Sequence, residues 1–566
     1  MSVDSTPSPQ GHATRTAGRL EGHGGDHAIE ALRAHGVQAM FTLSGAHVFP
    51  LYDGAVKADP ALPLIDVRHE QTAVFAAEGL AKLTRTPGLA VVTAGPGVTN
   101  SISAITTAHY NGSPLLVIGG RAPQFRWGTG ALQEMDHPPL LTTVTKQAAT
   151  IPGPNEVLGA VDDALRLAAT PHRGPVFLDV AMDHLFSRAE VELPAFTPPG
   201  RSVPDGDALD AVAARLSAAQ RPVLVLGSDV WTDGAEQAAL ELVEELGLPV
   251  IANGMGRGIL SAAHANLVTR ARSRAFAGAD LVVVVGTPLD FRLGYGSFGG
   301  RDGTPPADVV HLMDAASQLS GHVSLVASAA GDLGLILVGL RERLAGPGLF
   351  AGVQQWRQDL RAAHQAAVAA DLPLLTSDQA PIHPARIYGE LNAQLASDAV
   401  VIGDGGDFVS FAGRFVEPGR PGRWLDPGPF GCLGTGLGYA IAARLAHPSS
   451  QVVLLLGDGA AGFSLMDVDT MVRHRLPVVM VVGNNGIWGL EKFPMQMLYG
   501  YDVAAELTPG TRYDQVVRAL GGGGELVTEP DQIGPALRRA FDSGVPYCVN
   551  VLTDPKVAYP RTTTGI

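Results

Sequence analysis

The chain has 566 residues, of which 46% are hydrophobic and 17% are charged, and its formal net charge is −15 at pH 7. This length suggests domains of about 150 residues, three or four in all, and the negative charge argues against a nucleic-acid groove or a face for anionic membranes. The two cysteines, Cys432 and Cys548, cannot build a disulfide framework, so we expect a reducing, cytoplasmic environment and a core position for Cys432.

The first residues are polar, contain Pro, Ser and Thr, and lack the apolar region of a secretion signal. We expect a disordered tail over residues 1–16. No stretch of the sequence is apolar for long enough to span a membrane, so neither membranes nor nucleic acids are expected partners.

From residue 17 to 193, short apolar runs alternate with helical patterns, which predicts a parallel sheet with helices on both faces. The first expected strands are residues 38–43, 64–67 and 90–93. The first of these strands ends at a loop that contains His47, and the second ends at a helix entry that contains Glu70. The third ends at the glycine-rich turn 94–100. A carboxylate at a helix entry compensates the helix dipole, so the position of Glu70 by itself leaves a structural role open.

A Pro-rich linker at residues 190–204 ends this first domain. In residues 205–345 apolar runs again alternate with helical patterns, and the apolar runs lie at 222–227, 248–252 and 281–286. No GxGxxG fingerprint follows the first of these runs, so the sequence does not predict a working dinucleotide site.

The last domain, residues 375–566, follows an expected helix at 354–370. Its strand 400–404 ends in Gly405 and Gly406, which allow phosphate oxygens to approach the backbone closely. A second glycine-rich segment, 431–440, is only a weak match to a Rossmann turn.

Two neighbouring strands of this domain end in side chains that carry oxygen. The apolar run 452–456 stops at Gly457-Asp458-Gly459, and the run 476–482 stops at Gly483-Asn484-Asn485. The carboxyl ends of parallel strands lie at one sheet edge. Carboxylate and amide oxygens are suitable ligands for Mg²⁺, and phosphate oxygens can complete its octahedral coordination.

The helix expected at 460–475 begins with small residues after Asp458. Gly459 and Ala460 would let backbone N–H groups approach a diphosphate. The sequence therefore predicts a Mg²⁺–diphosphate site, and two ordinary turns are the alternative.

This arrangement, GDG followed by a spacer and NN, resembles the metal–diphosphate motif of thiamine-diphosphate-dependent enzymes. The resemblance runs from about residue 17 to residue 560 and is greatest to the group of acetolactate synthase, oxalyl-CoA decarboxylase and 2-hydroxyacyl-CoA lyase. It implies an α/β fold of three doubly wound parallel-sheet domains. These are a pyrimidine-binding domain (17–193), a central nucleotide-binding-like domain (205–345) and a diphosphate-binding domain (375–566). It also implies a homodimer or homotetramer, because in this family the first and last domains meet across a subunit interface.

The resemblance further implies the contacts to the cofactor. Asp458, the Asn485 side chain and the Ile487 carbonyl would ligate Mg²⁺. Glu70 would hydrogen-bond the aminopyrimidine and drive it to the imino form that removes the thiazolium proton. Leu433 would be the apolar wedge that bends the cofactor. The remaining expected contacts are Gly95, Gly405, Gly406, Gly431, Gly459 and Ala460.

Three further residues are candidates for contact with the substrate. Gln133 resembles a family glutamine near the substrate, and His47 resembles a histidine of benzaldehyde lyase that faces the reacting carbon. Glu491, in the loop after the metal site, would relay a proton when a 2-hydroxyacyl-CoA is cleaved. Each residue has a simpler alternative. Gln133 could be a surface amide, His47 a surface imidazole, and Glu491 one partner of an exposed ion pair with Lys492.

The expected chemistry is decarboxylation, carboligation or cleavage at a carbonyl carbon. The Asn-Gly-Ile-Trp run at 485–488 resembles the acyl-CoA branch, which favours a 2-hydroxyacyl-CoA lyase that yields formyl-CoA and a ketone or aldehyde. The alternative is an acetolactate synthase-like condensation of two 2-oxo acids, although Ala181-Met182-Asp183 and Glu491-Lys492 differ from the residues of that enzyme. A catalytically silent cofactor-binding homologue is a third hypothesis.

The resemblance leaves the ligand of the central domain open. Relatives hold FAD or an ADP group there, and Asp290-Phe291-Arg292 resembles a segment whose arginine lies near that nucleotide. The sequence does not decide among FAD, ADP and neither.

Overall fold

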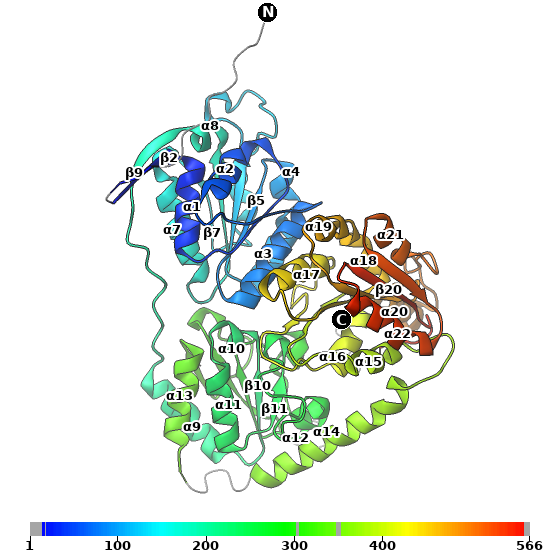
Figure 1. Cartoon of the computed structure of the whole chain (residues 1–566). Helices are drawn as coiled ribbons and strands as arrows, with labels where there is room; N and C mark the ends of the chain where they lie inside the picture. The colour runs from blue at the N-terminus through cyan, green and yellow to red at the C-terminus, as the bar shows by residue number, and fades with distance from the viewer. Residues whose placement is uncertain (1–13, 17, 301–304, 347–352, 560–566) are drawn as a thin grey trace, which may run out of the picture. The chain divides into compact units, whose positions relative to one another are not determined.

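The computed structural model describes residues 14–16, 18–300, 305–346 and 353–559 (Figure 1). The chain forms two compact units, one ending at Pro199 and one that starts at Gly200 and also takes in Lys82–Arg85. Three parallel sheets of six, five and six strands carry helices on both faces, so the expected class of three doubly wound α/β sheets is confirmed. No helix within the described ranges is long and apolar enough to cross a membrane.

A small antiparallel sheet of three strands accompanies the first unit. Its strands are β1 (Thr14–Thr16), β2 (Arg19–His23) and β9 (Arg188–Glu192). The expectation of disorder is wrong for Thr14–Thr16, because backbone pairing with β2 orders them. The rest of the predicted tail lies outside the described residues.

The large sheet of the first unit has the strand order β4-β3-β5-β6-β8-β7. Its strands are β3 (Met40–Thr42), β4 (Leu64–Asp66), β5 (Gly88–Val92), β6 (Leu115–Arg121), β7 (Gln147–Ile151) and β8 (Pro175–Ala181). Its longer helices are α1 (Gly24–Ala34), α2 (Phe49–Lys57), α3 (Glu70–Thr84), α5 (Ile102–Tyr110) and α7 (Val157–Ala169). Every residue of β5, β6 and β8 is buried, as strands covered by helices on both faces require.

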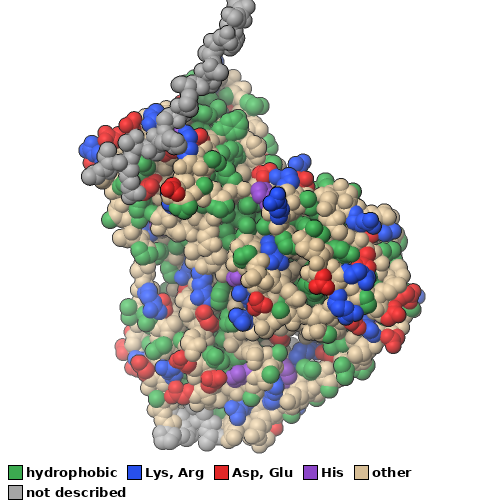
Figure 2. All heavy atoms as spheres, viewed as in Figure 1, with side chains coloured by type: hydrophobic (Ala, Val, Ile, Leu, Met, Phe, Trp, Pro, Cys, Tyr) green, Lys and Arg blue, Asp and Glu red, His purple; other side chains and the backbone are tan. Residues whose placement is uncertain are grey.

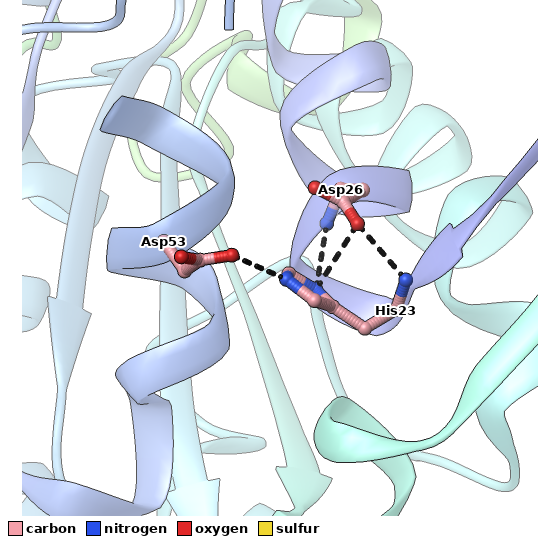
Figure 3. Close-up of side chains that lie close together, drawn as sticks. All are labelled: His23, Asp26 and Asp53. Carbon is pink, nitrogen blue, oxygen red and sulfur yellow. Dashed lines mark hydrogen bonds and ion pairs between the residues drawn. The ribbon is translucent and has the colours of Figure 1, made fainter. Parts of the chain in front are cut away.

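Helix α1 begins with a histidine cap that also contacts α2 (Figure 3). His23 Nδ1 accepts a hydrogen bond from the Asp26 N–H (3.2 Å), and Asp26 Oδ2 accepts one from the His23 N–H (2.9 Å). Nδ1 is therefore the acceptor nitrogen, so Nε2–H donates to Asp53 Oδ2 on α2 (2.8 Å). Lys57 also binds Asp53 Oδ2 (2.6 Å), and its positive charge opposes a cation here. This cluster is a helix cap rather than a metal site.

The central sheet, in the second unit, has the strand order β11-β10-β12-β13-β14, with all pairs parallel. Its strands are β10 (Pro222–Leu226), β11 (Val250–Ala252), β12 (Leu281–Val285), β13 (Asp308–Met313) and β14 (Ala327–Ala330). Its helices include α9 (Gly206–Ala218), α10 (Ser228–Thr232), α11 (Glu236–Leu246), α12 (Arg272–Gly278) and α13 (Leu333–Leu344). The long helix α14 (Val353–Leu375) then leads to the last sheet (Figure 1).

The last sheet has the order β16-β15-β17-β18-β20-β19 and is also parallel throughout. Its strands are β15 (Val400–Asp404), β16 (Trp424–Leu425), β17 (Val452–Gly457), β18 (Val479–Asn484), β19 (Gly523–Val527) and β20 (Tyr547–Leu552). Its helices include α15 (Pro384–Asn392), α16 (Asp407–Phe415), α17 (Thr435–Ala446), α20 (Gly489–Tyr499), α21 (Tyr513–Ala519) and α22 (Ile533–Asp542).

The single helix expected at 460–475 is in fact two helices, α18 (Asp458–Ser464) and α19 (Val468–Arg473), joined by a short 3-10 turn. Ser464 leaves helical geometry with a φ of −140°, and Asp467 Oδ1 accepts a hydrogen bond from the Thr470 hydroxyl (3.0 Å) at the start of α19. The run that periodicity alone predicts to be continuous is therefore interrupted at Ser464.

Figure 2 shows the charged side chains on one face of the molecule. On the face shown in Figure 2, Lys and Arg side chains are interspersed with Asp and Glu, and the coloured residues form no continuous basic groove there. This agrees with the net negative charge of the sequence.

The cap of α1 gives a first prediction. His23→Ala should lower the free energy of unfolding of the first unit by about 1 kcal/mol, because the Asp26 N–H loses its acceptor. His23→Asn keeps a capping oxygen and should recover part of this loss, measured by chemical denaturation. Equal losses in both variants would contradict the capping role.

Candidate active site

The strongest candidate lies at the carboxyl edge of the last sheet. β17 and β18 pair so that Gly457 lies opposite Gly483, which brings the two strand ends together. Asp458 follows β17 and is 4% exposed. Its Oδ2 accepts a hydrogen bond from the Gly486 N–H (2.6 Å) and its Oδ1 accepts one from the Gly459 N–H (3.0 Å). The carboxylate therefore bridges both strand ends.

Asp458 lacks a cationic side chain at salt-bridge distance within the described part of the chain. Burial raises the pKa of its carboxyl to about 6, and the hydrogen bonds from Gly486 and Gly459 oppose that shift. A buried carboxylate without a paired charge is costly unless a cation accompanies it. The site thus fits a bound Mg²⁺, which takes oxygen ligands of this kind.

The other two predicted metal ligands lie in the same place. Asn485 follows β18, and its Oδ1 accepts a hydrogen bond from the Ile487 N–H (3.1 Å), which folds the segment into a tight turn. Asp458, Asn485 and Ile487 all line one pocket of about 480 Å³.

The predicted cofactor contacts of this domain also line that pocket. They are Gly405, Gly406, Gly431, Leu433, Gly459 and Ala460. Gly405 has a φ of +115°, a conformation that side chains rarely adopt. A Cβ on Gly406 would come within 2.6 Å of Leu490, and one on Gly459 within 2.5 Å of the Trp488 ring. The glycines are therefore needed for the loop before α20 to pack over this edge.

Asp404, at the end of β15, is a site residue that the sequence analysis missed. It is fully buried, and its carboxylate accepts hydrogen bonds from the Gly434 N–H (3.2 Å) and the Gly436 N–H (2.8 Å). Burial raises the pKa of this carboxyl to about 7. Asp404 thus holds the turn that follows Leu433 and caps α17. Asp404 could have been predicted from the sequence, because it is a carboxylate at a strand end that precedes a glycine, as Asp458 is.

A buried network of polar side chains supports the turn that contains Asn485. Asn484 Nδ2 donates to the Asn550 side chain (3.1 Å) and to the Thr511 carbonyl (2.9 Å). Asn550 Nδ2 donates to Asp514 Oδ1 (3.2 Å), and Asp514 also accepts two hydrogen bonds from Arg512 (2.9 and 2.6 Å). The network fixes the residue next to Asn485.

Glu491 lies in the first turn of α20 and lines the same pocket. Lys492 forms its ion pair with Glu506 instead. The alternative in which Glu491 is neutralised by Lys492 is therefore wrong.

In the first unit, Glu70 is the first residue of α3 and is 6% exposed. Its Oε2 accepts a hydrogen bond from Asn100 Nδ2 (3.0 Å). Asn100 ends the glycine-rich turn after β5, so the turn and the carboxylate lie together. A helix-dipole role does not require this side-chain partner, and Asn100 is an addition to the predicted site.

His47 and Gln133 are brought together by Thr93. His47 Nδ1 lies 2.9 Å from Thr93 Oγ1, and Thr93 Oγ1 donates to Gln133 Oε1 at 3.4 Å. Gln133 has a φ of +60°, and a Cβ on Gly95 would come within 3.0 Å of its side chain. His47 is only 7% exposed, so it is not a surface imidazole. Burial lowers its pKa, and a hydrogen bond to the Leu132 backbone opposes this shift, so it is neutral at pH 7.

The position of Gly95 depends on His137, which no sequence pattern marked. The Gly95 N–H donates to His137 Nε2 (2.9 Å), so His137 Nδ1–H donates to Asp179 Oδ2 (2.8 Å). Both side chains are fully buried, and Arg121 also donates to Asp179 Oδ2 (3.1 Å). This network fixes the turn that carries Gly95.

In the central domain, Arg292 is held by Asp290, with Nη2 to Oδ2 at 2.7 Å. Asn253, Phe291 and Arg292 line the same pocket as Asp458. The predicted nucleotide segment therefore borders the candidate cofactor pocket.

The pKa of Asp458 gives a second prediction. Because only the ionised carboxylate binds Mg²⁺ and half of it is protonated near pH 6, Mg²⁺ affinity should be about tenfold weaker at pH 5 than at pH 7. Titration calorimetry measures this, with Asp458→Asn expected to lose binding at both pH values. A flat pH profile for the parent protein would contradict the assignment.

The buried network gives a third prediction. Asn550→Leu should weaken Mg²⁺ binding by about 10–100-fold, because Asn484 loses its support and the adjacent Asn485 turn loosens. Asn155→Leu, at an exposed position in the first unit, is the matched control. If Asn550→Leu keeps full affinity while remaining folded by circular dichroism, the network has no positioning role.

Comparison with known proteins shows the family to which the chain belongs. The domain described as "Thiamine pyrophosphate enzyme, N-terminal TPP binding domain" matches residues 22–140, the central domain of the same family matches 209–340, and its C-terminal TPP binding domain matches 404–551. "Probable acetolactate synthase" of Mycobacterium bovis is 50% identical over 99% of both chains. "2-hydroxyacyl-CoA lyase 2" of Caenorhabditis elegans is 33% identical over 93% of this chain and 87% of its own, and the Mus musculus protein of that name is 34% identical over 94% and 90%. The chain belongs to the thiamine pyrophosphate enzyme family and is a thiamine-diphosphate-dependent enzyme that makes or breaks carbon–carbon bonds.

Proposed function

We propose that this enzyme is a 2-hydroxyacyl-CoA lyase that yields formyl-CoA and a ketone or aldehyde. The observation that carries the proposal is the buried His47, which is joined through Thr93 to Gln133 and whose pKa is lowered by burial, so that the neutral imidazole is favoured. Cleavage beside a hydroxyl-bearing carbon requires the hydroxyl proton to leave as the new carbonyl forms. A neutral imidazole is suited to take that proton.

When bound, thiamine diphosphate supplies a nucleophilic carbon and an electron sink. Asp458, Asn485 and the Ile487 carbonyl would hold its Mg²⁺. Glu70, oriented by Asn100, would hold a proton at the aminopyrimidine ring. Backbone N–H groups near the glycines of the pocket would bind the diphosphate.

Glu491 supports the same reaction. It lines the pocket and Lys492 is engaged with Glu506, so its carboxylate can return a proton to the carbon that becomes the formyl group. Gln133 would orient the substrate carbonyl by hydrogen bonding.

The second candidate is an acetolactate synthase-like condensation of two 2-oxo acids, favoured by the 50% identity to proteins named as acetolactate synthases. In that reaction His47 would donate a proton to the acceptor alkoxide. Helix α8 (Met182–Phe186) begins where that enzyme carries a lysine, and Asp183 there accepts a hydrogen bond from the Gln124 N–H (2.8 Å). Ala181, Met182 and Asp183 thus supply no lysine where that enzyme carries one.

The assembly is also a proposal. Large apolar side chains are exposed in both units, among them Leu132 at 79%, Phe125 at 72% and Met497 at 69%. Exposed apolar groups of this kind commonly form interfaces, which supports a homodimer or homotetramer. We further propose that FAD or ADP binds beside Arg292. The substrates would be small molecules, the protein would have no nucleic-acid or membrane partner, and its location would be cytoplasmic.

The deciding experiment offers pyruvate and a 2-hydroxyacyl-CoA separately to the protein with thiamine diphosphate and Mg²⁺, with products followed by mass spectrometry. We expect formyl-CoA from the second substrate. His47→Ala should lower that rate by about 10²–10⁴-fold, whereas the control His264→Ala, outside the cluster, should not. Acetolactate and CO₂ from pyruvate, with no formyl-CoA, would overturn the lyase assignment. A Glu70→Gln variant as active as the parent would favour the third hypothesis, a catalytically silent homologue.

A further inference from the structure

A second cavity, unconnected with the proposed reaction, lies in the second unit. Its volume is about 580 Å³, within the range of small-molecule sites. It is lined by the loop 262–270 of the central domain, by helix α14, and by segments of the last domain around α15 and the end of α16. It shares no lining residue with the pocket of Asp458. We call it the α14 cavity.

One end of the α14 cavity is positively charged. Arg270 binds Asp371 Oδ2 and Arg414 binds Asp371 Oδ1, and Asp371 is only 3% exposed. Glu417 is paired with Arg257 (3.2 Å). Arg361, the third arginine of the wall, donates to the backbone carbonyls of Leu267 (3.1 Å) and Ala263 (3.2 Å), and it has no carboxylate at salt-bridge distance among the described residues. Three arginines and two carboxylates line the cavity, which leaves an excess of one positive charge.

Two arginines of the wall carry buried hydrogen-bond donors behind its surface. The buried Nε–H groups of Arg270 and Arg414 have no acceptor among the described residues. His364 Nδ1 accepts from the Arg270 N–H (3.3 Å), so the proton of this imidazole is on Nε2. Burial, with Arg361 and Arg270 nearby, lowers the pKa of His364 to about 4, so it stays a neutral donor. Buried donors of this kind call for an acceptor.

The remainder of the wall is mostly apolar. Its larger apolar side chains are Leu267, Val368, Leu375, Leu395, Val401 and Phe415. Positive charge at one end and apolar side chains elsewhere match a ligand with one anionic group and a compact hydrocarbon body.

From this geometry we propose that the α14 cavity binds a small monocarboxylate with an aliphatic body, as an effector separate from the substrate. The carboxylate lies beside Arg361, which has no carboxylate partner among the described residues, and the hydrocarbon contacts α14.

Two elements connect this cavity to the cofactor pocket. Strand β15 places Val401 in the cavity wall and is followed by Gly405 and Gly406 in the cofactor pocket. Helix α16 begins in the cofactor pocket and ends with Arg414 and Phe415 in the cavity wall. A ligand that shifts either element changes the affinity for thiamine diphosphate, and the coupling is reciprocal.

The test is calorimetric titration of hexanoate into the full chain without cofactor, with hexan-1-ol as the uncharged probe. We expect saturable binding of hexanoate and at least about tenfold weaker binding of hexan-1-ol. Ala369 lines the cavity, whereas Ala366 on the same helix does not. Ala369→Trp should therefore weaken hexanoate binding by about tenfold or more, and Ala366→Trp should leave it unchanged.

Absent or unsaturable hexanoate binding, equal binding of hexan-1-ol, or undiminished binding to Ala369→Trp would overturn the proposal. Saturating hexanoate should also change the dissociation constant of thiamine diphosphate in the parent protein and not in Ala369→Trp. An unchanged constant in the parent would refute the effector role. The hexanoate titration contains neither cofactor nor substrate, so its result is independent of the reaction proposed above.

Discussion

The buried carboxylate of Asp458 is the constraint on which the candidate site depends. It is placed at the shared edge of β17 and β18 by the register of two apolar strands, and it receives backbone hydrogen bonds from both strand ends. Without a cation, burial raises its pKa and disfavours its charge. A divalent cation with a diphosphate would remove this cost, and the proposed site would then link the fold to the cofactor chemistry at one side chain.

The surrounding residues serve to fix this edge. Asp404 holds the turn after Leu433, and the network from Arg512 to Asn484 holds the segment that carries Asn485. In the first unit, His137 has the same kind of role for Gly95. Each half of the proposed site thus has buried polar groups that position the residues expected to contact the cofactor.

Much of this arrangement is predictable from local sequence. Apolar runs that end in Asp458 and Asn485 define strand ends, and the parallel class then requires both ends at one edge. Asp404 is marked by the same signal. His137 and Thr93 are not predictable in this way, because their partners lie 42 and 40 residues away and no spacing rule connects them. The break between α18 and α19 is also hidden, since the periodic pattern continues through Ser464, where the backbone leaves helical geometry.

The most direct test of this account is the stoichiometry of thiamine diphosphate binding with and without Mg²⁺, measured by calorimetry on protein freed of metal. The account predicts one cofactor per chain in the presence of Mg²⁺ and binding weakened by orders of magnitude in the presence of a chelator. Equally tight binding in chelator would contradict it, because Asp458 would then hold no metal between the sheet edge and the diphosphate.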